Sequence, residues 1–198
     1  SSLCSDNPDQ SNKILNAVNE YIMNAPASLD YFLNSLLELS IHPLDKVHDQ
    51  AIEIIKTYYK PKNEQIVEKI NQHAIENLQK SPTEENPEPY LELFFAIIEL
   101  NMSLFLNLMD VYSVSPSKLQ PILREKLKKK IMTMPFDIGV IKDALAMALG
   151  VKSKTVLMHF YLSELAKKLT VPPDLIELLK IQFNTSHDSR YLIPIIPN

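Results

Sequence analysis

Three carboxylate side chains near residue 50 have the type and spacing that could bind a metal ion. Asp45, Asp49 and Glu53 stand four residues apart, so on a helix they would form one row along one face. Such a row could ligate a divalent cation through its oxygens. Lys46 and Lys56 flank the row, however, and no second helix with matching carboxylates is evident. We therefore expect a solvated helix face here and no metal site.

The histidines and the cysteine are placed where neither zinc binding nor nucleophilic catalysis is expected. The histidines are His42, His48, His73, His159 and His187. No two of them stand four residues apart, the spacing that puts two zinc ligands on one helix face. Cys4 lies in a polar leader, and one cysteine supports neither an internal disulfide nor a thiolate metal site. The sequence also lacks a Walker loop, a Gly-x-Gly-x-x-Gly motif and a nucleophile elbow, so we expect no enzyme and no cofactor.

The composition indicates that helices must position whatever site the chain has. Only 2 of the 198 residues are glycine, and both hairpin turns and phosphate-binding loops depend on glycine. Apolar residues make up 45% of the chain, which is enough for a core, and the 14 prolines lie mostly between apolar-periodic stretches. Acidic and amide side chains interrupt the most apolar stretch, residues 90–114, so we expect no membrane-spanning segment.

Apolar periodicity and proline breaks predict about ten helices. The expected ranges are 9–23, 29–41, 44–59, 64–78, 89–100, 102–112, 117–132, 138–149, 154–169 and 173–183. Asp137 and Ser153 are expected to cap the helices that follow them, and Gly150 is expected to end the helix before it. Residues 1–8 are expected to be a disordered polar leader, and residues 81–88 a polar loop. The remainder, residues 9–198, is predicted to form a single helical-repeat domain.

Alternate helices begin at regular intervals, which favours a repeat architecture. They start near Ser28, Asn63, Asn101, Asp137 and Pro173, a step of roughly 35 to 38 residues. Paired antiparallel helices at this spacing predict an α-solenoid of HEAT-like helix pairs. The stretch from Pro43 to Ala51 resembles the second helix of a HEAT unit, with His48 in place of its arginine. A compact helical bundle is the alternative.

The charge distribution is uneven, although the net charge is only −4. Residues 81–117 contain six acids and no base, whereas residues 118–154 contain nine bases and three acids. Arg124, Lys128 and Lys129, on the expected helix 117–132, could bind an acidic protein segment or RNA phosphates. A solvated helix face is the alternative interpretation. The basic helix carries no aromatic side chain for stacking on bases, so an acidic segment is at least as good a candidate as RNA.

The last fifty residues carry the most specific motif. A helix, the segment Leu169-Thr170-Val171-Pro172-Pro173-Asp174-Leu175 and another helix precede Asp188-Ser189-Arg190-Tyr191-Leu192-Ile193-Pro194. This arrangement resembles the symplekin family, the scaffold subunits of the eukaryotic pre-mRNA 3′-end processing machinery. The order and spacing of the preceding acidic-apolar and basic helices are also similar to that family. The family's separate N-terminal domain has no counterpart here, so the resemblance points to a segment of the C-terminal half.

The resemblance implies a nuclear, non-catalytic scaffold. Its partners would be protein subunits of the cleavage and polyadenylation specificity factor, namely the endonuclease and its inactive nuclease-like partner. We predict a partner-binding surface made of the basic helix (Arg124, Lys128, Lys129) and the terminal motif (Asp188, Arg190, Tyr191). The alternative function is an RNA-binding helical repeat that uses the basic helix 118–130. The terminal motif has two interpretations, either the first turn of a packed terminal helix or an open docking edge.

Overall fold

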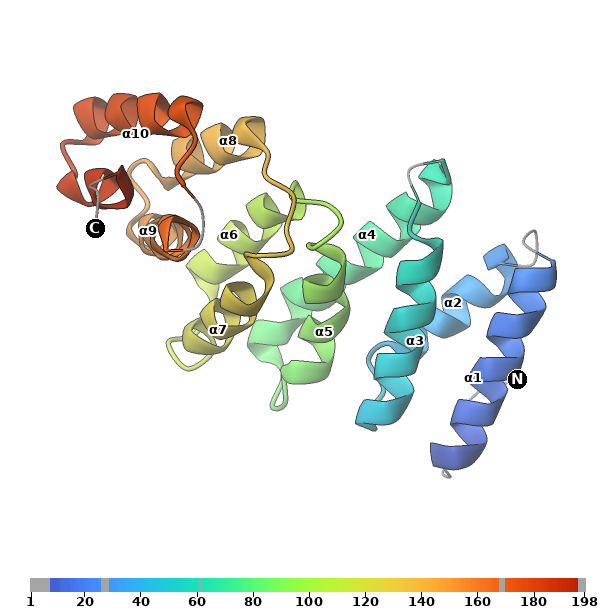
Figure 1. Ribbon diagram of the computed structural model, residues 1–198. Coiled ribbons are helices and arrows are strands. Elements are labelled where there is room, and N and C mark those ends of the chain that lie inside the picture. The colour runs from blue at the N-terminus through green and yellow to red at the C-terminus, as the bar shows by residue number, and fades with distance from the viewer. Residues whose placement is uncertain (1–7, 26–28, 61, 168–169, 196–198) are drawn as a thin grey trace. The chain divides into compact units, whose positions relative to one another are not determined.

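The computed structural model describes residues 8–25, 29–60, 62–167 and 170–195, and in these ranges it contains helices and turns but no strand. Figure 1 shows the helices in chain order. With η denoting a 3-10 helix, they are α1 (Pro8–Asn24), α2 (Leu29–Leu39), α3 (Asp45–Tyr58), α4 (Glu64–Lys80), η2 (Ser81–Thr83), α5 (Glu88–Ile97), α6 (Leu104–Val114), α7 (Gln120–Lys130), α8 (Ile138–Ala148), α9 (Lys152–Ala166), α10 (Pro173–Ser186) and η3 (Ser189–Ile195). The prediction of an all-α helical-repeat arrangement is confirmed, because each helix packs mainly on helices close to it in sequence.

The chain divides into two compact units, residues 1–97 and 98–198. The prediction of a single domain over residues 9–198 stays a prediction. In the first unit α3 packs against α1, α2 and α5, and α4 packs against α2 and α5. Apolar side chains at helical spacing fill the space between these helices. The fully buried ones include Leu33, Leu36, Val47, Ile55, Ile70, Leu78 and Phe94.

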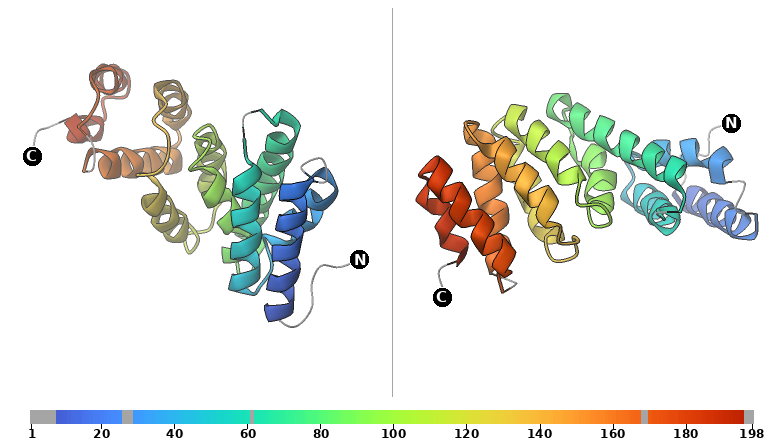
Figure 2. Two further views of the ribbon diagram at one scale, coloured as in Figure 1. Left: turned by 45° about the vertical axis from the view of Figure 1, so that its right-hand side comes forward. Right: turned by 90° about the horizontal axis from the view of Figure 1, so that it is seen from above.

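The second unit is assembled around α9. This helix packs against α6, α7, α8 and η3, while α10 packs on α8 and η3 (Figures 1 and 2). The Phe105 ring on α6 lies 4.8 Å from the Tyr161 ring on α9, centroid to centroid, and both residues are buried. Leu123 and Leu127 complete the buried stripe of α7. The core therefore holds α9 from several sides, which fixes this helix relative to η3.

The helix ends agree with the local sequence signals in most places. The Asp137 carboxylate accepts hydrogen bonds from the backbone N–H groups of Gly139 (2.8 Å) and Val140 (3.2 Å), as a helix cap does. Gly150 has a φ of 74°, which a residue without Cβ adopts readily, so its predicted place after a helix end is confirmed. Ser81, expected in a loop, is buried in η2 and donates its hydroxyl to the Leu78 carbonyl at 2.7 Å.

One local prediction was wrong, and one predicted helix start is displaced. Ser153 does not cap α9, because the chain is already extended at Val151 after the turn at Gly150 and the helix begins at Lys152. The basic helix α7 begins at Gln120, three residues later than expected, after a turn in which the Leu119 N–H donates to the Pro116 carbonyl. Residues 1–7, which include Cys4 and most of the predicted leader, lie outside the described residues, and so does Ser28. None of the described helices has both the length and the apolar character that a membrane span requires.

Candidate binding surfaces on α7 and at the C-terminal motif

Arg124, the first predicted contact residue of the basic helix, is held against the core. Its Nη1 donates a hydrogen bond of 2.6 Å to the Tyr112 hydroxyl, and the guanidinium carbon lies 6.0 Å from the centre of the Tyr112 ring. Tyr112 belongs to α6 and is completely buried. Arg124 therefore satisfies the buried hydroxyl and fastens α7 to α6, and only part of its guanidinium remains for a partner.

The end of α7 carries two exposed lysines. Lys130 is half-buried and pairs with Glu99 at 2.9 Å, whereas Lys128 and Lys129 are exposed. Lys129 lies 4.0 Å from the Glu125 carboxylate, and both side chains are more than 60% exposed. This ion pair therefore contributes little to the stability of the fold. Lys128 makes no ion pair within the described part of the chain. Two predicted contact residues are thus available to a partner.

Exposed apolar side chains follow these lysines. Met132 and Phe136, in the connection from α7 to α8, are 49% and 42% exposed. We call Lys128, Lys129, Met132 and Phe136 the α7–α8 corner. Aromatic and methionine side chains are enriched in protein interfaces, and a phenylalanine ring is also suited to stacking on a nucleobase. Met132 and Phe136 were not predicted from the sequence, because they lie beyond the basic helix itself.

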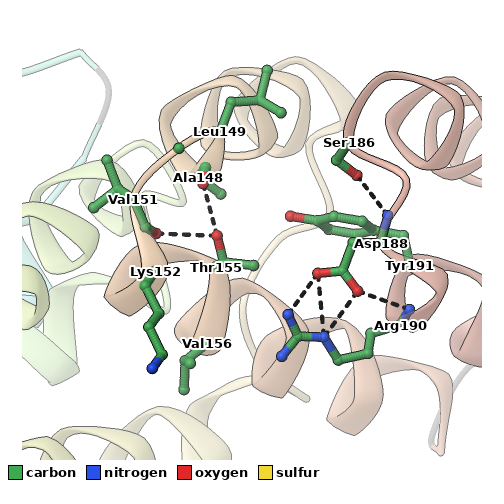
Figure 3. A pocket seen from close by; sticks show the side chains of 11 residues that line it. Ala148, Leu149, Val151, Lys152, Thr155, Val156, Ser186, Asp188, Arg190 and Tyr191 are labelled. Carbon is green, nitrogen blue, oxygen red and sulfur yellow. Dashed lines mark hydrogen bonds and ion pairs between the residues drawn. The ribbon is translucent and has the colours of Figure 1, made fainter.

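The C-terminal motif forms an ion-pair cluster on the surface of α9. Arg190 Nε donates to Asp188 Oδ1 at 2.9 Å, and Arg190 Nη2 donates to Oδ2 at 2.6 Å (Figure 3). The backbone N–H of Arg190 also donates to Oδ1, at 3.1 Å. On the other side, His159 Nε2 lies 3.1 Å from Asp188 Oδ2. One carboxylate thus joins η3 to the middle of α9.

The electrostatics of this cluster follow from burial and pairing. The Arg190 guanidinium holds the pKa of the Asp188 carboxyl well below its usual range, and Asp188 in turn raises the pKa of Arg190. Burial lowers the pKa of His159, against the opposing effect of its hydrogen bond to Asp188. His159 Nδ1 is buried and has no partner within the described ranges. A neutral imidazole with its proton on Nε2 fits this setting, since it donates to Asp188 and leaves no buried N–H unpaired.

Tyr191, the third motif residue, belongs to the core. Its exposure is 1%, and its ring lies 4.3 Å from the His159 ring, centroid to centroid. Burial raises the pKa of its phenol. We expected Tyr191 at a partner contact; its ring is enclosed where η3 packs on α9 and α10, and a direct contact with a partner stays a prediction. Of the two interpretations of the motif, its packing agrees with a docked terminal turn, formed as the 3-10 helix η3.

A pocket of about 370 Å³ opens beside the ion-pair cluster (Figure 3). Its lining residues come from the end of α8, the start of α9 and the C-terminal motif: Ala148, Leu149, Gly150, Val151, Lys152, Thr155, Val156, Ser186, Asp188, Arg190 and Tyr191. We call it the motif pocket. Leu149 and Val151 are 42% and 38% exposed at its wall, and Thr155 donates its hydroxyl to the Ala148 carbonyl at 2.7 Å. The pocket combines apolar and cationic lining.

The carboxylate row on α3 takes part in pairing with basic groups. Glu53 accepts from Lys56 at 2.9 Å, and Asp49 lies 3.1 Å from His48 Nε2. Asp45 and Asp49 border a polar hollow of about 280 Å³ in the first unit, together with side chains of α5. Within the ranges that the structure describes, no group of three or more His, Cys, Asp or Glu residues is placed to hold a metal ion.

The motif pocket was not foreseen from the sequence, although one signal pointed to it. Gly150 followed by Val151 and Lys152 marks a tight turn that ends in an exposed cation. Lys152 and Arg190, 38 residues further along the chain, line one pocket because η3 packs on α9. His159 stood in the sequence as one of several isolated histidines.

No protein-family model matches the chain, and no curated protein or solved structure is detectably similar to it.

Proposed function

We propose that the chain is a non-catalytic, protein-binding scaffold of the nuclear machinery that cleaves and polyadenylates pre-mRNA. Its partners would be the endonuclease subunit of the cleavage and polyadenylation specificity factor and the inactive nuclease-like partner of that subunit. The resemblance of the 188–194 motif to the symplekin family supports this proposal. The helical-repeat arrangement also supports it, because such arrays expose extended surfaces on which other proteins dock.

The observation that carries the proposal is the α7–α8 corner. Within nine residues of the chain, two exposed lysines are followed by an exposed methionine and an exposed phenylalanine, in a unit that otherwise buries most of its large apolar side chains. Interfaces between proteins combine apolar and polar side chains, and this corner contains both kinds. A partner with an acidic rim around an apolar patch would be complementary to it.

The predicted binding residues differ in their role in partner binding. Arg124 fastens α7 to α6 through the Tyr112 hydroxyl, so it determines where Lys128 and Lys129 project. Asp188 fixes Arg190 and anchors η3 on α9. We therefore assign Arg124, Asp188 and Tyr191 positioning roles, and we assign direct contact to Lys128, Lys129 and Arg190.

Affinity capture from nuclear extract tests the proposal. The wild-type chain, the K128E/K129E variant and the K69E/K80E variant serve as baits, and mass spectrometry identifies the captured proteins. Lys69 and Lys80 are exposed lysines on α4 in the other unit, so their reversal is a matched change of charge. We expect the wild type and K69E/K80E to capture the endonuclease and its nuclease-like partner, and K128E/K129E to lose them. Equal capture by all three baits would refute the role of the α7–α8 corner.

RNA binding is the second candidate function, and the exposure of Phe136 favours it. Single-strand RNA sites combine cationic side chains with aromatic rings on which bases stack, and the α7–α8 corner contains both kinds of exposed residue. A site that neutralises several phosphates loses affinity for RNA steeply with rising salt. Titration of an oligouridine in low and high salt, with F136A as a variant, distinguishes the two. Captured proteins that disappear after nuclease treatment would also favour RNA.

A further inference from the structure

The motif pocket contains a lysine without an ionic partner and an arginine held in place beside it. Lys152 is exposed and makes no ion pair with any residue that the structure describes, whereas Lys154, two residues later, pairs with Asp110 at 2.6 Å. Arg190 uses Nε and Nη2 on Asp188, which leaves its Nη1 without a partner among the described residues. The pocket therefore offers N–H donors from two cationic groups.

The ion pair in the pocket presents its positive side to solvent. The Arg190 side chain is 55% exposed, while that of Asp188 is 20% exposed and faces His159 as well. Although the pair is neutral as a whole, an approaching ligand meets the guanidinium before the carboxylate. Asp188 also orients the guanidinium in advance, so less side-chain entropy is lost when a ligand binds.

The rest of the pocket is suited to an aliphatic side chain. Leu149, Val151 and Val156 line it, and the first two are exposed although they are large and apolar. Figure 3 shows Val156 below Thr155, with the Lys152 side chain to its left and the Arg190 guanidinium to its right. The aromatic residue in the lining, Tyr191, is buried and cannot stack on a base, which argues against a nucleotide.

From these features we infer that the motif pocket binds an acidic segment of a partner protein, with its carboxylates on Lys152 and Arg190 Nη1 and a neighbouring aliphatic side chain against Leu149, Val151 and Val156. This inference rests on the proposed function, whose protein contacts it extends to a second surface. Charge complementarity and the mixed lining select this occupant over RNA, since a carboxylate next to an aliphatic group matches both parts of the pocket.

Binding of defined peptides to the whole chain tests the inference. The first probe is a fluorescein-labelled peptide in which glutamate and leucine alternate, the second has glutamine in place of glutamate, and the third is an oligouridine of similar length. Fluorescence anisotropy measures the affinities, and amide NMR shifts locate the site. We expect the acidic peptide to bind at least about tenfold more tightly than the glutamine peptide, because a charged hydrogen bond contributes about 1.5–3 kcal/mol. The amides of Gly150, Lys152 and Arg190 should shift.

Matched variants assign this affinity to the pocket. K152E should weaken binding of the acidic peptide about tenfold or more, whereas K142E, at an exposed lysine on α8 outside the lining, should leave it unchanged. L149N should weaken binding by loss of the aliphatic contact. Circular dichroism checks that each variant is folded. Equal affinity of K152E and the wild type would overturn the inference, and so would failure of the acidic peptide to bind at about millimolar concentration.

The remaining outcomes separate this inference from the proposed function and from RNA binding. Oligouridine that binds more tightly than the acidic peptide and is weakened by K152E would make the pocket a phosphate site and refute the acidic-segment proposal. Peptide binding that K152E abolishes, together with no capture of the endonuclease subunits, would retain the pocket and remove the proposed assembly. Capture that K128E/K129E abolishes, together with no peptide binding, would retain the proposed assembly and refute the inference about the motif pocket.

Discussion

The carboxylate of Asp188 joins η3 to α9, so its removal should lower stability. We expect D188A to lower the free energy of unfolding by about 3 kcal/mol, worked out from its bonds. The bond to His159 Nε2 accounts for about 1.5–2 kcal/mol, because the histidine side chain is only 12% exposed and the acceptor is charged. The pair with Arg190 contributes only about 0.5 kcal/mol, because the arginine is 55% exposed. The bond from the Arg190 backbone N–H contributes about as much again.

Chemical denaturation measures this loss, with D143A as the matched control. Asp143 is an exposed aspartate on α8 with no ion pair in the described structure, so D143A should change stability by less than about 0.5 kcal/mol. Urea unfolding followed by circular dichroism gives the free energies, and amide hydrogen exchange shows which helices open. We expect faster exchange in η3 and where η3 packs on α9. The reasoning is refuted if D188A and D143A unfold alike, or if η3 keeps its protection in D188A.

Three further predictions concern pH, α7 and the turn before α9. Burial lowers the pKa of His159 from 6.5, so the unfolded chain binds this proton more readily than the folded chain. The free energy of unfolding should therefore fall as the pH drops below about 6.5. Urea titrations at several pH values should show a weaker pH dependence for H159Q than for the wild type. The contribution of Asp188 should fall progressively as the pH drops below about 3.8, because the unfolded chain then takes up a proton that the folded carboxylate still resists. R124A should lower the free energy of unfolding by about 1–2 kcal/mol, because it leaves the buried Tyr112 hydroxyl unpaired. Thermal melting of R124A and of Y112F/R124A tests this prediction. The double variant should recover part of the loss, because it has no hydroxyl to leave unpaired. G150A should lower the free energy of unfolding by about 1 kcal/mol in the same assay. Backbone strain alone causes this loss, because no atom lies within 4 Å of the position that the alanine Cβ would take. A much larger loss would contradict this account.

Local signals in the sequence predicted the helices and several of their ends. Asp137 caps α8 and Gly150 follows it in a left-handed conformation, as expected. Pro173 begins α10 because its missing N–H and restricted φ suit the first helical turn. Such preferences involve a residue and the next few neighbours, so they can be read without knowledge of the fold. The prediction for Ser153 failed because the turn at Gly150 started α9 before the serine could cap it.

Only the tertiary structure decided what the candidate site residues do. Arg124 meets Tyr112 across 12 residues, and His159 meets Asp188 across 29, so neither pairing follows from spacing along one helix. The sequence therefore determined that the chain is helical, that it is rich in cations between residues 118 and 154, and that a distinctive motif lies near residue 190. The packing of the helices determined which cations form internal pairs and which, such as Lys152, remain exposed. The physical reason is that burial and pairing depend on neighbours that helix packing brings together, whereas helix formation depends largely on neighbours along the chain.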